Sequence, residues 1–285
     1  MLNKTETKSR KVFGKIHDNQ SNNHNLFKRI STLFDTKYFQ VNKDFFKDKV
    51  CLDAGCGSSL TGMHNLLSLG AKKVYGLDLN DTIFNGEKNI KKFKGKYELK
   101  TGSILSLPFP DNSFDFVMSV GVLHHTTNFF KGLKELKRVL KPNGTLYVEV
   151  EGKGGLVREL SEYLRKKYRC DKEFNKLIKG LNTNQFNILD KIMFDEDLVG
   201  TIKDRLQAPL YTQTSEKEIV DWLKKEGFTN IRRLRKFQKF RNIRKYLAPI
   251  YYNYKHPFSR ILYGDGGCVN ILCLKDYTSN NHPKY

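Results

Sequence analysis

The sequence lacks several features that would place it outside the cytoplasm. None of its apolar runs reaches the ~18 residues of a membrane-spanning helix, and residues 1–11 are polar and basic rather than an apolar secretory signal. The five cysteines are odd in number and include no C-x-x-C pair, which argues against a disulfide framework and against a cysteine zinc site. We therefore expect a cytoplasmic protein with reduced thiols and no metal centre.

Acidic residues are also scarce. The 285 residues include 30 Asp and Glu against 51 Lys and Arg, which gives a net charge of +21. No acid occurs between Gly227 and Gly264, and within that stretch residues 235–263 interleave basic and aromatic side chains. Such a charge indicates an anionic partner, such as nucleic acid, a phosphorylated metabolite or a membrane surface. A compositional explanation is an equal alternative, because Lys and Asn are abundant throughout.

The sequence also lacks the complete nucleotide-binding fingerprints. Residues 50–59 (VCLDAGCGSS) predict a buried strand that ends in a glycine turn. Leu60 stands where the third glycine of G-x-G-x-x-G would be, and no P-loop pattern is present. Gly55 and Gly57 would let a ligand approach the backbone, and Asp53 is placed to meet a cationic or hydroxyl-bearing group. An ordinary strand-to-helix turn explains this stretch alone equally well.

Strand-like and helix-like segments alternate in the first half of the chain. We predict strands at 49–55, 73–79, 97–104, 114–120 and 145–150, with helices near 60–69, 81–92 and 128–140. This alternation indicates βαβ units and a parallel sheet. Ligands of such sheets bind beyond the carboxyl ends of the strands. Asp53, Asp78, Ser103, Ile104 and the segment after Val120 all fall at such ends.

The alternation is interrupted twice, which we interpret as insertions at about 153–210 and 235–267. The first would cover the open face of the domain, and residues 156–168 within it are predicted to be helical. Between them, a capping box at Ser215 and Glu218 predicts another helix, and residues 228–234 and 268–274 predict two further strands. We expect a flexible basic N-terminus over 1–24, a helical cap over 25–48, the main α/β domain over 49–278 and a flexible tail over 279–285. The segments 24–34 and 38–46 predict one or two helices in the cap.

The order and spacing of these motifs resemble those of class I S-adenosylmethionine-dependent methyltransferases, in the broad subgroup that methylates quinones and other small molecules. The segments that carry the resemblance are VCLDAGCG (50–57), Asp78, LPFPDNSFD (107–115), VLHH (122–125) and RVLKPNG (138–144). The similarity is good over 48–150, weaker over 211–234 and 263–275, and poor in the two insertions. It implies a Rossmann-like, doubly wound, mostly parallel seven-stranded sheet, and S-adenosyl-L-methionine as cofactor.

The resemblance also implies which residues bind the cofactor. The turn from Asp53 to Gly57 would lie against its methionine part, and Asp78 would accept hydrogen bonds from both ribose hydroxyls through its two oxygens. Ser103 and Ile104 would flank the adenine, although many relatives have Asp where Ser103 stands. Backbone groups near Val120 would hold the amino end. The full predicted set is Asp53, Gly55, Cys56, Gly57, Asp78, Leu79, Ser103, Ile104 and Val120.

His124 and His125 follow the fourth predicted strand, where the resemblance places the transferred methyl group. A histidine there suits a general base near neutral pH. A structural role in packing or orienting the loop is the alternative, because relatives with varied chemistry share this pair. Glu149 and Glu151 are lesser candidates that could equally be solvated or bind a polar end of the substrate.

Three functions are consistent with these observations. The leading one is methyl transfer to a small-molecule acceptor, anionic or lipid-like. The alternative is an RNA or DNA methyltransferase that uses the basic aromatic segment 235–263. Against it, residues 119–122 read SVGV rather than the Asn/Asp-Pro-Pro-Tyr/Phe of amino-methylating nucleic-acid enzymes, and a Pro-Cys nucleophile is missing. The third is a non-catalytic scaffold, which the intact Asp53, Gly55, Gly57 and Asp78 argue against.

Overall fold

The computed structural model describes residues 4–21, 27, 33–182, 198–235, 246, 250 and 253–277. Seven strands form one sheet in the order β3-β2-β1-β4-β5-β7-β6. The strands are β1 (Val50–Ala54), β2 (Lys73–Asp78), β3 (Tyr97–Thr101), β4 (Phe114–Val120), β5 (Leu140–Glu151), β6 (Phe228–Arg233) and β7 (Cys268–Lys275). β7 runs antiparallel to β5 and β6, and β1 to β5 pair in parallel. The predicted doubly wound, mostly parallel sheet is confirmed.

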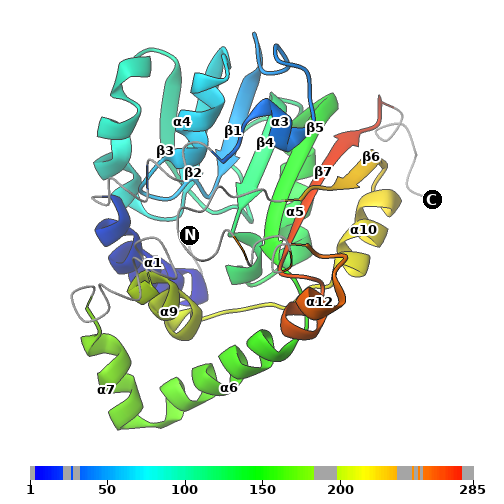
Figure 1. The fold of residues 1–285 in the computed structure, drawn as a ribbon. Coiled ribbons are helices and arrows are strands. Elements are labelled where there is room, and N and C mark those ends of the chain that lie inside the picture. The colour runs from blue at the N-terminus through cyan, green and yellow to red at the C-terminus, as the bar shows by residue number, and fades with distance from the viewer. Residues whose placement is uncertain are drawn as a thin grey trace.

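Helices cover both faces of this sheet (Figure 1). The described α-helices are α1 (Lys4–Ser21), α3 (Thr36–Phe39), α4 (Thr61–Ser68), α5 (Phe129–Val139), α6 (Leu156–Cys170), α7 (Lys172–Gly180), α9 (Leu198–Gln207), α10 (Glu216–Lys225) and α12 (Pro257–Tyr263). Three short 3₁₀ helices are η1 (Asp81–Asn89), η2 (Lys91–Phe93) and η3 (Leu123–His125). None of the described helices is long and apolar enough to cross a bilayer.

The alternating side chains of the central strands divide the core in two. Leu52 and Val117 pack on the face covered by α5 and α10. Cys51 and Phe116 point to the other face, which α4 and the aromatic residues around α3 cover. Local signals fix the ends of the covering helices, since the Asn128 side chain caps α5 and the predicted Ser215–Glu218 capping box begins α10.

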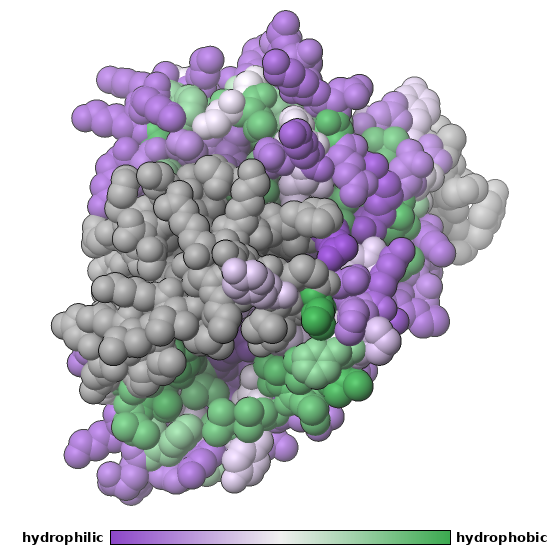
Figure 2. All heavy atoms as spheres, viewed as in Figure 1, coloured by the Kyte–Doolittle hydropathy of each residue, from purple (hydrophilic) through white to green (hydrophobic). Residues whose placement is uncertain are grey.

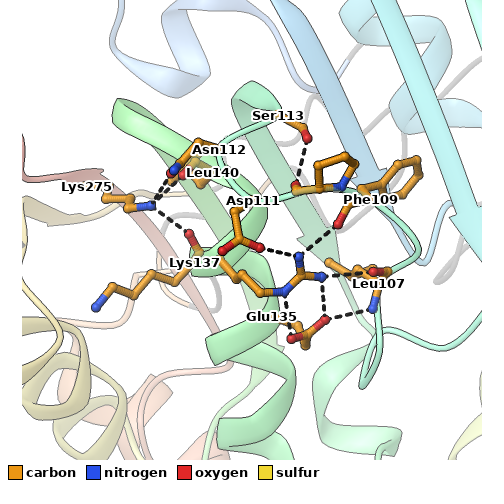
Figure 3. Close-up of polar contacts among 11 residues, drawn as sticks. Leu107, Phe109, Asp111, Asn112, Ser113, Glu135, Lys137, Leu140 and Lys275 are labelled. Carbon is orange, nitrogen blue, oxygen red and sulfur yellow. Dashed lines mark hydrogen bonds and ion pairs between the residues drawn. The ribbon is translucent and has the colours of Figure 1, made fainter. Parts of the chain in front are cut away.

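Ion pairs and hydrogen bonds fix the turn before β4 (Figure 3). Arg138 on α5 donates to the carbonyl oxygens of Leu107 and Phe109 at 2.9 and 2.8 Å and pairs with Asp111 and Glu135. These contacts give the LPFPDNSFD and RVLKPNG motifs a structural role. Nearby, the buried Lys275 ammonium donates to the Asn112 side chain and to the carbonyl oxygens of Lys137 and Leu140, which lie where α5 ends.

The N-terminal region differs from the sequence prediction. Residues 1–24 were expected to be flexible, but Lys4–Ser21 form α1, which packs beside η1 with Ser9 and Ile16 buried. A helix was expected near Tyr38–Phe46, but it ends at Phe39, where Gln40 takes a left-handed conformation with φ 54°. The segment 81–92 is 3₁₀ rather than α-helical. Most of the helix predicted over 24–34 lies outside the described residues, as do residues 236–245, 247–249 and 251–252 of the insertion at 235–267.

Candidate active site

A cavity of about 300 Å³ opens beyond the carboxyl ends of β1, β2 and β4. It is the place where the topology brings the predicted site residues together. The nine predicted cofactor-binding residues all line it: Asp53, Gly55, Cys56, Gly57, Asp78, Leu79, Ser103, Ile104 and Val120. His125 lines it as well, whereas His124 does not.

The glycine turn after β1 shapes one wall of this cavity. Gly55 has φ 89°, and a Cβ there would lie 2.1 Å from Val122 Cγ2, so the turn and the loop after β4 touch closely. The backbone N–H groups of Gly55 and Cys56 donate to the Leu77 carbonyl oxygen of β2 at 2.6 and 3.1 Å. Gly57 also has a positive φ, of 60°, and a Cβ there would meet no atom within 4 Å. The wall is therefore held firmly while open space remains in front of Gly57.

Asp53 is the last residue but one of β1, and its carboxyl group is buried against the beginning of α4. It accepts a hydrogen bond from the Met63 backbone, and a Cβ at Gly62 would lie 2.3 Å from its Oδ2. A glycine at position 62 therefore lets the carboxylate reach the amino end of the helix, where the helix dipole favours negative charge. Burial, and secondarily the charge of Asp78, nevertheless raise the pKa of Asp53 to about 7.

Asp78 ends β2 and is held by two backbone groups. Its Oδ2 accepts from the Gly57 N–H at 3.0 Å, and its Oδ1 accepts from the Asn80 N–H at 2.9 Å. The side chain is buried at the cavity wall. Each carboxylate oxygen has a second lone pair, so the group can accept further hydrogen bonds from a ligand without losing these two.

The two histidines lie at the other side of the cavity and differ in environment. The His125 ring packs against Phe13 in a tilted arrangement and against Tyr211 edge-on, and its Nδ1 lies 3.1 Å from the Leu210 carbonyl oxygen. His124 is buried, its ring centroid is 4.1 Å from that of His125, and its carbonyl oxygen accepts from the Thr212 N–H. Burial, followed by the charge of His125, lowers the pKa of His124 well below its usual range. This environment disfavours the charged form of the His124 imidazole.

The two glutamates considered as lesser candidates do not line the cavity. Glu149 is buried and accepts a hydrogen bond from the Tyr147 hydroxyl at 3.0 Å. Glu151 pairs with Arg158 and, at 3.3 Å, with Arg205. Burial raises the pKa of Glu151 to about 7 in spite of Arg205. Both side chains are engaged in the structure, which favours a structural role for them.

The charged face of α6 packs behind the histidines. Arg158 donates to the Tyr211 hydroxyl at 2.9 Å, and the Arg165 guanidinium lies over the Tyr211 ring at 4.1 Å from its centroid. Tyr211 in turn contacts both His124 and His125. The first insertion thus fixes the histidine loop through one tyrosine. Among the described residues, no group of His, Cys, Asp and Glu side chains has the arrangement of a metal site.

Comparison with known proteins assigns the fold to a family. Residues 52–148 match the family model described as a methyltransferase domain. This match spans the glycine turn, Asp78, both histidines and the Arg138 segment. The chain contains a class I, S-adenosylmethionine-dependent methyltransferase domain.

Curated relatives agree with this domain assignment. The chain is 37% identical to an uncharacterized protein of Methanocaldococcus jannaschii over 134 residues, which are 47% of this chain and 52% of that protein. It is 32% identical to the demethylmenaquinone methyltransferase of Geobacillus stearothermophilus, over 42% of this chain and 59% of that enzyme. It is 35% identical to the tRNA U34 carboxymethyltransferase of Cellvibrio japonicus, over 38% and 35% of the two chains. The matches thus span little more than half of these relatives at most.

Solved structures show the same fold at low sequence identity. One is the complex between the Haloferax volcanii Trm112 methyltransferase activator and a methyltransferase, with a TM-score of 0.53, 15% identity, and coverage of 97% of this chain and 100% of that one. Another is an S-adenosylmethionine-dependent methyltransferase of Mesorhizobium loti, with a TM-score of 0.51, 14% identity and coverage of 83% and 94%.

The cavity of the methyltransferase domain fits S-adenosylmethionine. Gly57 and Gly121 both line it with positive φ, and a Cβ at either would project into open space. This free space leaves room for a ligand against the backbone. Asp78 offers two carboxylate oxygens for hydroxyl groups, and Asp53 offers negative charge for a cationic ligand.

Several residues that line the cavity are not among the site residues predicted from the sequence. Glu6, Ser9 and Phe13 come from α1, and Asp204 comes from α9 in the first insertion. Ser103, which was expected beside the adenine, donates its hydroxyl to the Glu6 carboxylate. Ser9, Phe13 and Ile16 follow the i, i+4, i+7 spacing of a helix face, a signal that could have revealed α1. Asp204 has no comparable signal, because it follows no motif.

Proposed function

We propose that this chain transfers a methyl group from S-adenosylmethionine to a small-molecule acceptor that is anionic or lipid-like. The observation that carries the proposal is the convergence of all nine predicted cofactor residues on one cavity that also reaches His125. When bound, S-adenosylmethionine supplies a methyl group activated by its sulfonium sulfur. The residues of this chain would then bind, orient and shield the reactants.

Asp78 and Asp53 would hold the cofactor from two sides. The Asp78 carboxylate is oriented by the Gly57 and Asn80 N–H groups, so it meets ribose hydroxyls without having to reorganise. Ionised Asp53 would attract the positive end of the cofactor. The bound positive charge would in turn favour the ionised form of Asp53. Glu6, Ser9 and Phe13 of α1 line the cavity and would exclude water.

His125 is the better of the two candidates for a general base. Because a carbonyl oxygen can only accept, the contact with Leu210 places a proton on His125 Nδ1. In the neutral ring, Nε2 is then the nitrogen that takes a proton from the acceptor. We assign His124 a positioning role, because it is buried and does not line the cavity.

The names of the relatives support two classes of acceptor. A demethylmenaquinone methyltransferase is consistent with a lipid-like acceptor. A tRNA carboxymethyltransferase, together with the net charge of +21, supports the nucleic-acid alternative. About half of the basic aromatic segment 235–263, on which that alternative rests, lies outside the described residues, at 236–245, 247–249 and 251–252. We favour the lipid-like or anionic small molecule, because the SVGV segment after β4 lacks the residues of amino-methylating nucleic-acid enzymes.

The experiment that tests this proposal is transfer of a radiolabelled methyl group from S-adenosylmethionine into a fractionated cell lysate. We expect label in the organic or small-molecule fraction, and none when Asp78→Ala replaces the wild-type protein. Label in a nuclease-sensitive polymer would support the alternative instead. Absence of transfer together with absence of cofactor binding in calorimetry would refute both.

A further inference from the structure

Helix α6 has its polarity reversed relative to the usual surface helix. Its charged residues Arg158 and Arg165 are buried, with 3% and 2% of their surfaces exposed. Its apolar residues Leu156, Leu160 and Tyr163 are 56%, 57% and 64% exposed. These three lie at i, i+4 and i+7, on one face of the helix. A surface helix normally buries its apolar stripe, whereas this stripe faces outward and is left exposed by the part of the chain that the structure describes.

Neighbouring helices extend the apolar surface. Helices α7 and α12 both pack against α6, and they expose Leu177 on α7 and Phe258 and Ile261 on α12. Figure 2 shows hydrophobic side chains gathered along the lower part of the molecule, where Figure 1 places these helices. We call Leu156, Leu160, Tyr163, Leu177, Phe258 and Ile261 the apolar face. An apolar surface drawn from three helices usually marks an interaction site.

The same helices carry an excess of exposed positive charge. The exposed basic residues are Lys166, Lys167, Arg169, Lys172, Lys176, Lys179 and Arg260, against exposed acids at Glu159 and Glu173. Long basic side chains can lie along apolar surface while their charged ends stay in water. An exposed apolar stripe on helices that also carry exposed lysines is typical of helices that lie in the interface of an anionic bilayer.

We propose that the apolar face docks the protein on the surface of an anionic lipid bilayer, with Leu156, Leu160 and Tyr163 inserted at the headgroup level. Charge complementarity decides between a bilayer and a second copy of this chain as the binding partner of the apolar face. A second copy of this chain would bring the same basic surface against itself, with like-charge repulsion. An anionic bilayer instead attracts each lysine by about 1 kcal/mol, or about fivefold in affinity. Docking does not require methyl transfer, so it can be tested separately from the proposed function.

The test is flotation of the full chain with vesicles of phosphatidylcholine alone or mixed with phosphatidylglycerol, without cofactor. We expect binding to the mixed vesicles, and weaker binding at high salt. The double variant Leu156→Ser, Leu160→Ser should lose about a hundredfold in affinity, because each leucine contributes roughly a factor of ten. The triple variant Lys166→Gln, Lys172→Gln, Lys176→Gln should lose about fivefold per lysine, and on the mixed vesicles only.

Phe84→Ser is the matched control, because Phe84 is an exposed apolar residue on η1, outside the apolar face. It should float as the wild type does. The leucine variants keep the buried side of α6, so their thermal unfolding and their calorimetric affinity for S-adenosylmethionine should be unchanged. Equal flotation of wild type and leucine variant, or no flotation with mixed vesicles, would overturn the proposal. Self-association that the leucine variant abolishes would also overturn it and would assign the face to a dimer.

Discussion

The most direct test of the cofactor site is Asp78→Ala. In the structure the Asp78 carboxylate is buried at the cavity wall and already accepts two backbone hydrogen bonds, from Gly57 at 3.0 Å and Asn80 at 2.9 Å. The proposed role adds two hydrogen bonds from the ribose hydroxyls of the cofactor. Alanine removes all of these acceptors at once and leaves the two N–H groups without their partner.

The magnitude follows from the number of hydrogen bonds lost. A hydrogen bond to a charged group contributes about 1.5 to 3 kcal/mol, so the two ligand bonds together contribute about 3 to 6 kcal/mol. This corresponds to a loss of roughly a hundredfold to ten-thousandfold in affinity. Isothermal titration calorimetry with S-adenosylmethionine measures the change, and thermal unfolding of the variant checks that the fold is intact.

Asp81→Ala provides a matched control. Asp81 lies three residues later, pairs with Arg10 at the surface and does not line the cavity. Its removal should change cofactor affinity by less than about twofold, since exposed ion pairs contribute little. If Asp78→Ala is folded and binds S-adenosylmethionine as tightly as Asp81→Ala does, the placement of the ribose at Asp78 is refuted.

Three further predictions concern catalysis, pH dependence and stability. His125→Ala should lower turnover by about a hundredfold or more and cofactor affinity by less than about tenfold; equal losses in steady-state kinetics and calorimetry would instead indicate a positioning role. Cofactor affinity should rise by about tenfold per pH unit as the pH increases toward neutrality. The reason is that Asp53 has a pKa raised to about 7, so it is neutral below that pH and attracts the cationic cofactor only when ionised. Calorimetry across this pH range should show no such change in affinity for Asp53→Asn. Lys275→Met should lower the unfolding free energy by about 2 to 5 kcal/mol in urea denaturation, because three oxygen acceptors lose their buried donor. Lys134 is exposed, so Lys134→Met should have little effect on the unfolding free energy.

The sheet could be predicted because its signals are local and repeated. Apolar runs at β1, β2 and β4 each end in a glycine, an acid or a polar turn, and parallel strands place those ends at one edge. The nine cofactor residues follow from this geometry and from the resemblance, and the structure places them around one cavity. Their roles remain predictions.

The segments that cover the cavity could not be predicted in the same way. Helix α1 is polar enough to resemble a loose terminus, and it is held by tertiary contacts such as Arg10 with Asp81 and Glu6 with Ser103. Both contacts join positions more than seventy residues apart. Periodicity within the helix cannot reveal such partners. Segment η1 likewise has a partner far along the chain, because a Cβ at Gly86 would overlap the Ser58 carbonyl oxygen, so η1 passes close to the glycine turn.

Helix α6 shows why a correct helix prediction can leave its orientation open. Its residues 156–168 were predicted to be helical, and the ordinary rule for amphipathic helices would turn Leu156 and Leu160 inward. In the structure the arginine side faces inward, because Arg158 finds Glu151 and Tyr211 there, and a buried guanidinium is tolerable only when it is paired. The apolar side is left outside as a consequence. The contacts that fix the histidine loop and the face proposed for the bilayer are therefore two sides of one helix.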